Sequence, residues 1–199
     1  MAISILFIMA LPQALCSQIT DGELQEIYNH VIVEHENHLK TLKRKSLDNK
    51  FERGEYPKEK IDSIWAIIKN NRVNLIDRTD NAELDKFLER KNGYLFEKKF
   101  FANEDVQFMN NQLKDAAPIA FNKEYFDSPI DLVAFPENRY ERAKLQQDVY
   151  YLFSNPVFDK QHERMLFTVI INRGGINRFY FLYEYHNDDW VQVLGYSIE

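Results

Sequence analysis

The sequence predicts an α+β domain in which N-terminal helices pack on a C-terminal antiparallel sheet arranged as a meander. Apolar residues at helical spacing dominate the first half of the chain, whereas residues 149–196 contain three apolar runs rich in β-branched and aromatic residues. Helices followed by a run of strands are typical of α+β folds. No repeat, low-complexity tract or linker interrupts the 199 residues, so we expect residues 17–199 to form a single domain.

Composition and charge restrict the class of protein. The chain is 45% hydrophobic and 14% aromatic, which supplies a packed core and argues against disorder. Its formal net charge of -6 argues against a general nucleic-acid binder, because such a protein needs a basic surface. The single cysteine, Cys16, excludes a disulfide framework.

The first 16 residues are interpreted as a signal peptide. Residues 1–15 are uncharged and almost wholly apolar, and this run is too short to span a bilayer as a helix. Ala14 and Cys16 are small residues at the two positions that signal peptidase reads, which predicts cleavage before Ser17. We therefore expect export to the periplasm or the extracellular medium, and no transmembrane span after cleavage.

Two alternatives to simple export remain open. The apolar run has no preceding lysine or arginine, so it also fits a buried N-terminal segment. Cys16 suggests a lipoprotein in which this cysteine becomes the lipidated N-terminus. The residue before a lipidated cysteine is normally small, and here it is Leu15, which makes the lipid anchor the less favoured alternative.

Capping and spacing signals predict four helices ahead of the sheet. Thr20 and Glu23 have the spacing of a capping box, and the helix that they open carries apolar residues at helical spacing as far as Leu39. The polar residues 47–56 predict a loop. Pro57 suits the first position of a second helix. The apolar residues at helical spacing in the three later helices are Ile61, Ile64, Trp65 and Ile68; Leu84, Phe87 and Leu88 within residues 82–90; and Val106, Met109 and Leu113 after Asn103.

Weaker signals lie between these helices. Residues 73–76 predict a short strand, Asn92 and Gly93 a helix stop, and residues 94–101 fit a strand or a helix. Residues 121–136 mix aromatic residues with prolines, which predicts an irregular, partly buried connection.

The terminal sheet is predicted from strands at residues 165–172, 178–185 and 190–196. A two-residue loop of Gly174 and Gly175 would place Ile170, Thr168 and Leu166 opposite Phe179, Phe181 and Tyr183. Both faces carry apolar side chains, so we expect helices on one face and partial cover on the other. The turn at residues 187–189 fits two or three residues, and the register of Trp190 stays open.

A resemblance adds to this reading. Asn103-Glu104-Asp105 opens a helix that contains Asn111-Gln112, and an FSNPVFDK segment, an apolar strand, a Gly-Gly turn and a strand opened by Asp189-Trp190 follow. This order resembles a group of uncharacterised bacterial secreted proteins and lipoproteins that share an FSxPxF segment, a glycine-rich turn and a terminal Trp-containing strand. The resemblance covers about the last half of the chain and implies export and fold but no site residues. Members often carry cysteines around the glycine turn, which this chain lacks.

One candidate site is a metal centre. Four-residue steps on a helix place His30, Glu34 and His38 near one face, and imidazole and carboxylate suit zinc. Residues 35–38 look like the HExxH motif of metalloproteases but are one residue short. The alternative is that these are solvated polar residues beside the apolar stripe. We expect no cofactor unless this site holds zinc.

A second candidate site is the aromatic face of the sheet. Phe179, Phe181, Tyr183, Tyr185 and Trp190 are either core residues or, where helices leave them uncovered, a platform for a peptide, glycan or apolar ligand. Tyr183, Tyr185 and Trp190 are expected to be the partly exposed ones, because each carries a polar group. Residues 186–189 offer two carboxylates for calcium or acid–base chemistry, although a hairpin turn is the simpler explanation of these residues.

These observations favour an exported, non-enzymatic binding or interaction domain with a protein or glycan ligand. The first alternative is a metal-dependent hydrolase that uses His30, Glu34 and His38. The second is a factor of envelope assembly or maintenance that works through a larger partner. The sequence contains no GxSxG, Walker A or GxGxxG motif, so it nominates no hydrolase elbow or phosphate loop.

Overall fold

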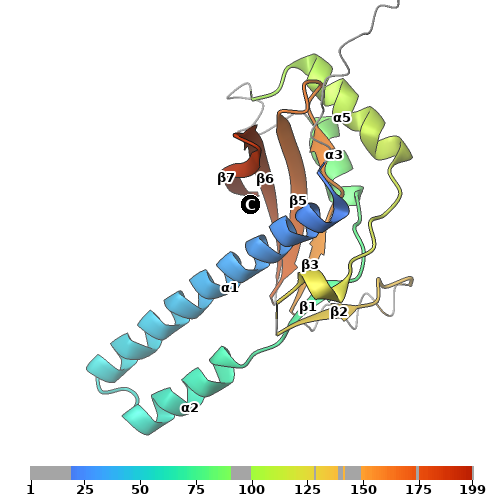
Figure 1. Cartoon of the computed structure of the whole chain (residues 1–199). Coiled ribbons are helices and arrows are strands. Elements are labelled where there is room, and N and C mark those ends of the chain that lie inside the picture. The colour runs from blue at the N-terminus through green and yellow to red at the C-terminus, as the bar shows by residue number, and fades with distance from the viewer. Residues whose placement is uncertain are drawn as a thin grey trace, which may run out of the picture.

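The computed structural model describes residues 19–90, 100–127, 129–138, 141, 149–173 and 175–198, and this part of the chain has the predicted α+β architecture (Figure 1). The predicted signal peptide, Asn92, Gly93 and most of residues 94–101 lie outside the described residues. The elements are α1 (Asp21–Glu52), α2 (Lys58–Lys69), β1 (Val73–Ile76), α3 (Ala82–Arg90), α5 (Asn103–Asp115), the 3-10 turn η1 (Lys123–Tyr125), β2 (Ile130–Val133), β3 (Tyr150–Phe153), β4 (Val157–Phe158), β5 (Arg164–Asn172), β6 (Ile176–His186) and β7 (Asp189–Ile198).

Helix α1 begins at the predicted capping box. The Thr20 hydroxyl accepts a hydrogen bond from the Glu23 backbone N–H (3.2 Å), and the Glu23 carboxylate accepts one from the Thr20 backbone N–H (2.7 Å). The predicted loop at residues 47–56 is wrong for its first part, because α1 continues to Glu52. Leu47 is buried where α1 runs beside α2, and this contact stabilises helix in a stretch that is otherwise polar. The chain turns at Gly54, whose φ of 70° suits glycine.

Replacing Thr20 with alanine is expected to destabilise the protein by about 1 kcal/mol at neutral pH, because the Glu23 backbone N–H loses the hydroxyl that caps it at the start of α1. The hydrogen bonds from Thr20 lower the pKa of Glu23 below its ordinary 4.5. The stability linked to this carboxylate is therefore fully present above pH 4.5 and is lost as the pH falls through the folded-state pKa.

Thermal unfolding at about pH 7 and about pH 3 measures this effect. The wild type should lose part of its advantage over the Thr20 variant at the lower pH, because only the bond from the Thr20 hydroxyl to the Glu23 carboxylate depends on the charge of Glu23, whereas the cap formed by the Glu23 N–H and the Thr20 hydroxyl remains. Thr41→Ala is the control, since it removes a hydroxyl that donates a hydrogen bond to the Asn37 carbonyl on the same helix. A Thr20 variant whose deficit stays constant with pH would contradict the prediction.

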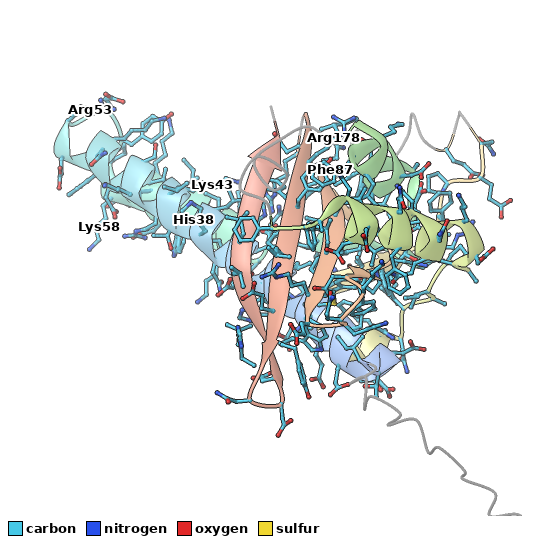
Figure 2. All side chains as sticks on the ribbon, turned by 90° about the horizontal axis from the view of Figure 1, so that it is seen from above. His38, Lys43, Arg53, Lys58, Phe87 and Arg178 are labelled. Atoms are coloured by element: carbon cyan, nitrogen blue, oxygen red, sulfur yellow. The ribbon has the colours of Figure 1, made fainter. Side chains whose placement is uncertain are left out.

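Helix α2 confirms the second predicted amphipathic helix. Pro57 occupies the N-cap position, and Ile61 is buried against α1. The Arg44 guanidinium of α1 lies over the Trp65 ring, 5.4 Å from its centroid. Together α1 and α2 form a hairpin that projects away from the sheet, with Lys43 on α1 and Arg53 and Lys58 near its tip (Figures 1 and 2).

The seven strands form one mixed sheet in the order β2-β1-β3-β5-β6-β7, with β4 paired to β5. The predicted antiparallel meander is confirmed for β5, β6 and β7. Strand β1 instead pairs in parallel with both β2 and β3. Strand β2 lies in the segment that we expected to be irregular. It is a four-residue edge strand. Pro129 is tolerated before it, because its carbonyl accepts a hydrogen bond from the Val73 N–H and no N–H is required of it.

Helices cover both faces of the sheet, so the partial cover expected on the second face is also helical. Helix α1 crosses one face, whereas α3 and α5 lie on the other (Figure 1). The core under α1 contains Leu24, Tyr28, Val31, Ile32, Phe153, Met165, Phe167, Val169, Ile171 and Tyr183. The core under α3 and α5 contains Leu84, Phe87, Leu88, Val106, Met109, Leu113, Leu166, Tyr180 and Leu182.

The β5–β6 register differs by one residue from the expected one. Asn172 lies opposite Ile176, so the connection has three residues rather than the expected two. Phe167 and Phe181 are therefore partners, and Met165 lies opposite Tyr183. This register collects large apolar side chains on the face that α1 covers, and a shift by one residue would send each of them to the opposite face.

The Ser154–Lys160 segment, which we interpreted as structural, forms a buried junction. Tyr28 donates its hydroxyl hydrogen to the Ser154 carbonyl (2.7 Å), and the Asn155 amide donates to the Ala117 carbonyl (2.8 Å). One carboxylate oxygen of Asp159 accepts hydrogen bonds from two backbone N–H groups of the following turn. These bonds tie β3, β4 and the segment after α5 together.

Candidate functional site

The β6–β7 hairpin presents two aromatic rings beside the N-terminal end of α1. Its loop contains two residues, Asn187 and Asp188, with φ angles of 52° and 64°. Asn and Asp tolerate these left-handed angles, which a tight hairpin turn requires. Tyr185 consequently lies opposite Trp190, and their ring centroids are 5.3 Å apart.

The same register sets Tyr183 opposite Gln192, and a register shift follows between Tyr183 and Leu182. Tyr183 donates a hydrogen bond to the Gln192 side-chain oxygen (3.2 Å). Burial, with a smaller effect of the Glu34 charge, raises the pKa of Tyr183 well above its ordinary value. The Tyr183 hydroxyl therefore stays protonated and acts as a fixed donor at the floor of the site.

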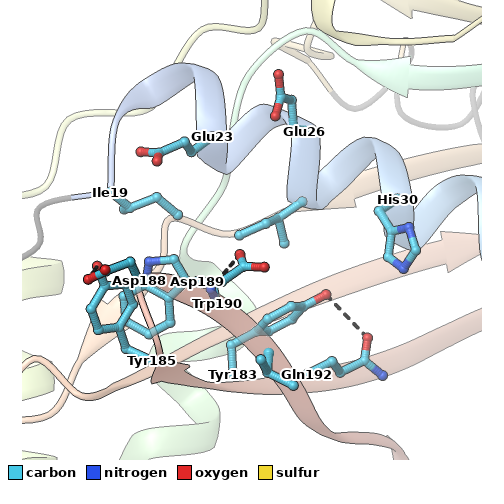
Figure 3. Close-up of a pocket in the computed structure, with 12 residues that line it drawn as sticks. Ile19, Glu23, Glu26, His30, Tyr183, Tyr185, Asp188, Asp189, Trp190 and Gln192 are labelled. Atoms are coloured by element: carbon cyan, nitrogen blue, oxygen red, sulfur yellow. Dashed lines mark hydrogen bonds between the residues drawn. The ribbon is translucent and has the colours of Figure 1, made fainter.

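Helix α1 and Ile19, two residues before its start, form the opposite wall of a cleft (Figure 3). The cleft has a volume of about 510 Å³, a size that holds small ligands or a protein side chain. We call it the aromatic–acidic cleft. Its lining residues are Ile19, Glu23, Glu26, Ile27, His30, Tyr183, Tyr185, Asp188, Asp189, Trp190, Val191 and Gln192.

The charged groups of the cleft are mainly carboxylates. Glu23 and Glu26 come from the first turns of α1, and Asp188 and Asp189 come from the β6–β7 turn. The Asp189 carboxylate accepts a hydrogen bond from the Trp190 backbone N–H (2.8 Å), which Figure 3 shows as a dashed line. No lysine or arginine is among the described residues that line the cleft.

The structure places the predicted ligand-binding residues in this cleft. Tyr185 and Trp190 are half-buried, as expected for aromatic residues with polar groups. Tyr183 is only 3% exposed, which corrects the expectation that it would be partly exposed. Its ring stacks near Phe167 in the core (centroids 5.7 Å apart), so only one edge of it reaches the cleft. Phe179 and Phe181 are half-buried and pack on the core beneath α1.

The predicted metal ligands are not assembled into a metal centre. His30 Nε2 lies 3.2 Å from a carboxylate oxygen of Glu34, and both side chains are about 60% exposed to solvent. His38 lies farther along α1, toward the projecting hairpin (Figure 2). Within the described ranges, no group of three or more His, Cys, Asp or Glu residues has an arrangement that could hold a metal ion.

Residues 186–189 form the predicted hairpin turn. The His186 ring nitrogen lies 3.2 Å from the Glu184 carboxylate, outside the cleft. Asp188 and Asp189 instead line the aromatic–acidic cleft, beside residues of α1 with which the sequence did not group them.

Sequence reasoning missed the contribution of α1 to the cleft. Ile27 belongs to the predicted apolar stripe, and Glu23 was recognised only as a cap. Glu26 carried no signal, because a single acidic residue on a helix is ordinary. Only the docking of α1 across the sheet brings these residues opposite the β6–β7 hairpin, which is more than 150 residues away in the chain.

A buried polar cluster, which the sequence did not indicate, lies farther along α1. Glu36 forms an ion pair with Arg173, and Tyr151 donates its hydroxyl hydrogen to Glu36 (2.6 Å). His35 Nδ1 lies 2.6 Å from the same hydroxyl, and burial lowers the pKa of His35. Tyr151 is fully buried, and burial raises its pKa well above the ordinary value. The cluster fixes α1 to β3 and to the end of β5.

Comparisons with known proteins add no relative. No protein-family model, curated protein or solved structure matches the chain. The resemblance to exported bacterial proteins thus stays an expectation. The helices within the described ranges are each too short or too polar to cross a membrane.

Proposed function

We propose that this chain is an exported, non-enzymatic binding domain whose ligand or partner places a group in the aromatic–acidic cleft. The observation that carries the proposal is the open space of about 510 Å³ in front of Tyr185 and Trp190. Aromatic rings that are half-buried at a concave site gain stabilisation when a ligand covers their remaining faces.

The polar groups of the cleft support a binding role. The Tyr183 hydroxyl is held by Gln192, the Asp189 carboxylate by the Trp190 backbone, and the Glu23 carboxylate by Thr20. Polar groups fixed in this way orient a ligand at little entropic cost. The helix and the hairpin that carry them are both anchored in the core, so the cleft is formed before a ligand arrives.

The two tryptophans provide the test. Trp190 lies in the cleft and Trp65 on α2. In NMR correlation spectra the indole N–H signal of Trp190 therefore reports binding in the cleft, and that of Trp65 serves as an internal reference. We expect members of a fragment library that includes sugars, amines and capped dipeptides to shift the Trp190 signal and leave Trp65 unchanged. Tyr185→Ala should weaken these ligands about tenfold or more, because losing an aromatic anchor costs about 2 kcal/mol.

Val193→Ala is the matched control, since Val193 is an exposed β7 residue outside the cleft lining. It should leave the fragment affinities unchanged. The proposal would be wrong if no member of the library shifted the Trp190 signal, or if the Trp65 signal shifted equally. Equal affinities in the Tyr185 variant and the wild type would do the same.

A further inference from the structure

We infer that the group that enters the aromatic–acidic cleft is an organic cation, a protonated amine or guanidinium carried on an apolar stem. The inference rests on the proposed function, because it names the ligand class of the same cleft. The cavity and its aromatic wall define the site, and the charges around it select the ligand.

Carboxylates lie on both sides of the cleft. Asp21 and Glu23 in the first turn of α1 offset the positive end of the helix dipole. Glu26, Asp188 and Asp189 are then an excess of negative charge, with no lysine or arginine among the described lining residues to neutralise it. The Glu26 carboxylate lies on the α1 side and points away from the sheet, at the rim (Figure 3). An anionic ligand would meet repulsion from both walls.

The aromatic wall suits a cation equally well. The Tyr185 and Trp190 rings lie beside each other, inclined at 53°, and both line the cleft. A cation over the face of tryptophan or tyrosine is attracted by the ring quadrupole. Phe158 packs behind Trp190, with centroids 5.8 Å apart, and holds that ring in place.

Apolar side chains line the remaining part of the cleft. Ile19 and Ile27 lie on the same wall as Glu23 and Glu26. They provide contact for a methylene chain, while the charged end reaches the rings and the carboxylates. Lysine and arginine side chains and free alkyl amines share this chemistry.

The experiment uses one scaffold in three charge states. Nα-acetyl-lysine methylamide, its neutral Nε-acetyl derivative and its anionic Nε-succinyl derivative are titrated while the Trp190 indole signal is followed. We expect the cation to bind about tenfold or more tightly than the neutral compound, and its binding to weaken in about 1 M salt. Titration with n-pentylamine distinguishes a free amine from a peptide side chain as the source.

A matched pair of variants tests the carboxylates. Glu26→Gln with Asp188→Asn removes two charges from the cleft, and Asn keeps the tolerance for the φ of 64° at position 188. Glu52→Gln with Glu59→Gln removes two exposed charges from the α1–α2 hairpin and serves as the control. Only the cleft pair should reduce the preference for the cation, by about tenfold.

The outcomes separate the two proposals. Equal binding of the neutral and cationic compounds would overturn the cation assignment and leave the binding function standing. The same conclusion would follow if the cleft pair and the hairpin pair had equal effects. If neither these compounds nor the fragment library shifts Trp190, the binding function and the cation assignment both fail.

Discussion

Replacing Phe167 with alanine is expected to destabilise the protein by about 4 kcal/mol, because it opens a cavity at the centre of the core beneath α1. Phe167 has no exposed surface. Its ring lies 5.0 Å from Tyr28, 5.5 Å from Phe181 and 5.7 Å from Tyr183, measured between centroids. Helix α1 and strands β5 and β6 all contribute to this cluster, so no single neighbour can move to fill the space.

Denaturant unfolding of the Phe167 variant measures the loss of stability. Phe51→Ala is the control, because Phe51 is 51% exposed on the projecting end of α1. It should change the free energy of unfolding by less than about 0.5 kcal/mol. If Phe167→Ala does not fold, Phe167→Leu should lose about half as much and remain measurable. A loss below about 1 kcal/mol for the alanine variant would show that the core is organised around other residues.

Replacing Glu36 with alanine is expected to cost about 3 kcal/mol, because it leaves the Arg173 charge buried without its partner. The Glu36 and Arg173 side chains are only 11% and 16% exposed. Glu36 also accepts the hydrogen bond of the buried Tyr151 hydroxyl, which would lose its acceptor. The Arg173 Nε atom is buried without a hydrogen-bond partner among the described atoms, so this guanidinium is already incompletely satisfied.

The double variant Glu36→Leu with Arg173→Met provides the decisive comparison. It removes both charges and restores apolar contact, so it should recover most of the stability that Glu36→Ala loses. Glu34→Ala on the same helix is the control and should have little effect, because Glu34 is about 60% exposed. A double variant as unstable as the single one would show that the ion pair itself stabilises the junction of α1, β3 and β5.

Local signals in the sequence were sufficient wherever structure depends on neighbours in the chain. The capping box at Thr20 predicts the start of α1, and the spacing of Leu84, Phe87 and Leu88 predicts α3 and its buried face. These signals act within one or two turns, where hydrogen bonds and side-chain spacing are set by adjacent residues.

The errors lie where distant contacts outweigh local preference. Residues 47–52 look like a loop, yet α1 continues through them because Leu47 is buried where the helix runs beside α2. Strand β2 carries weak local signals and forms because β1 offers it a parallel edge. The three-residue β5–β6 connection likewise follows from the apolar face that α1 covers, which outweighs the preference for a two-residue glycine turn.

The candidate site shows the same division. By itself the sequence determined the α+β class, the antiparallel β5–β7 strands and the aromatic residues Tyr185 and Trp190 as a candidate surface. Only the tertiary structure decided that Tyr183 is mostly core and that Glu23 and Glu26 line one cleft with the β6–β7 turn. It also decided that His30 and Glu34 form no metal centre with His38 within the described part of the chain. The physical reason is that a cleft forms between elements distant in sequence, and burial of the shared core beneath α1 sets their relative position.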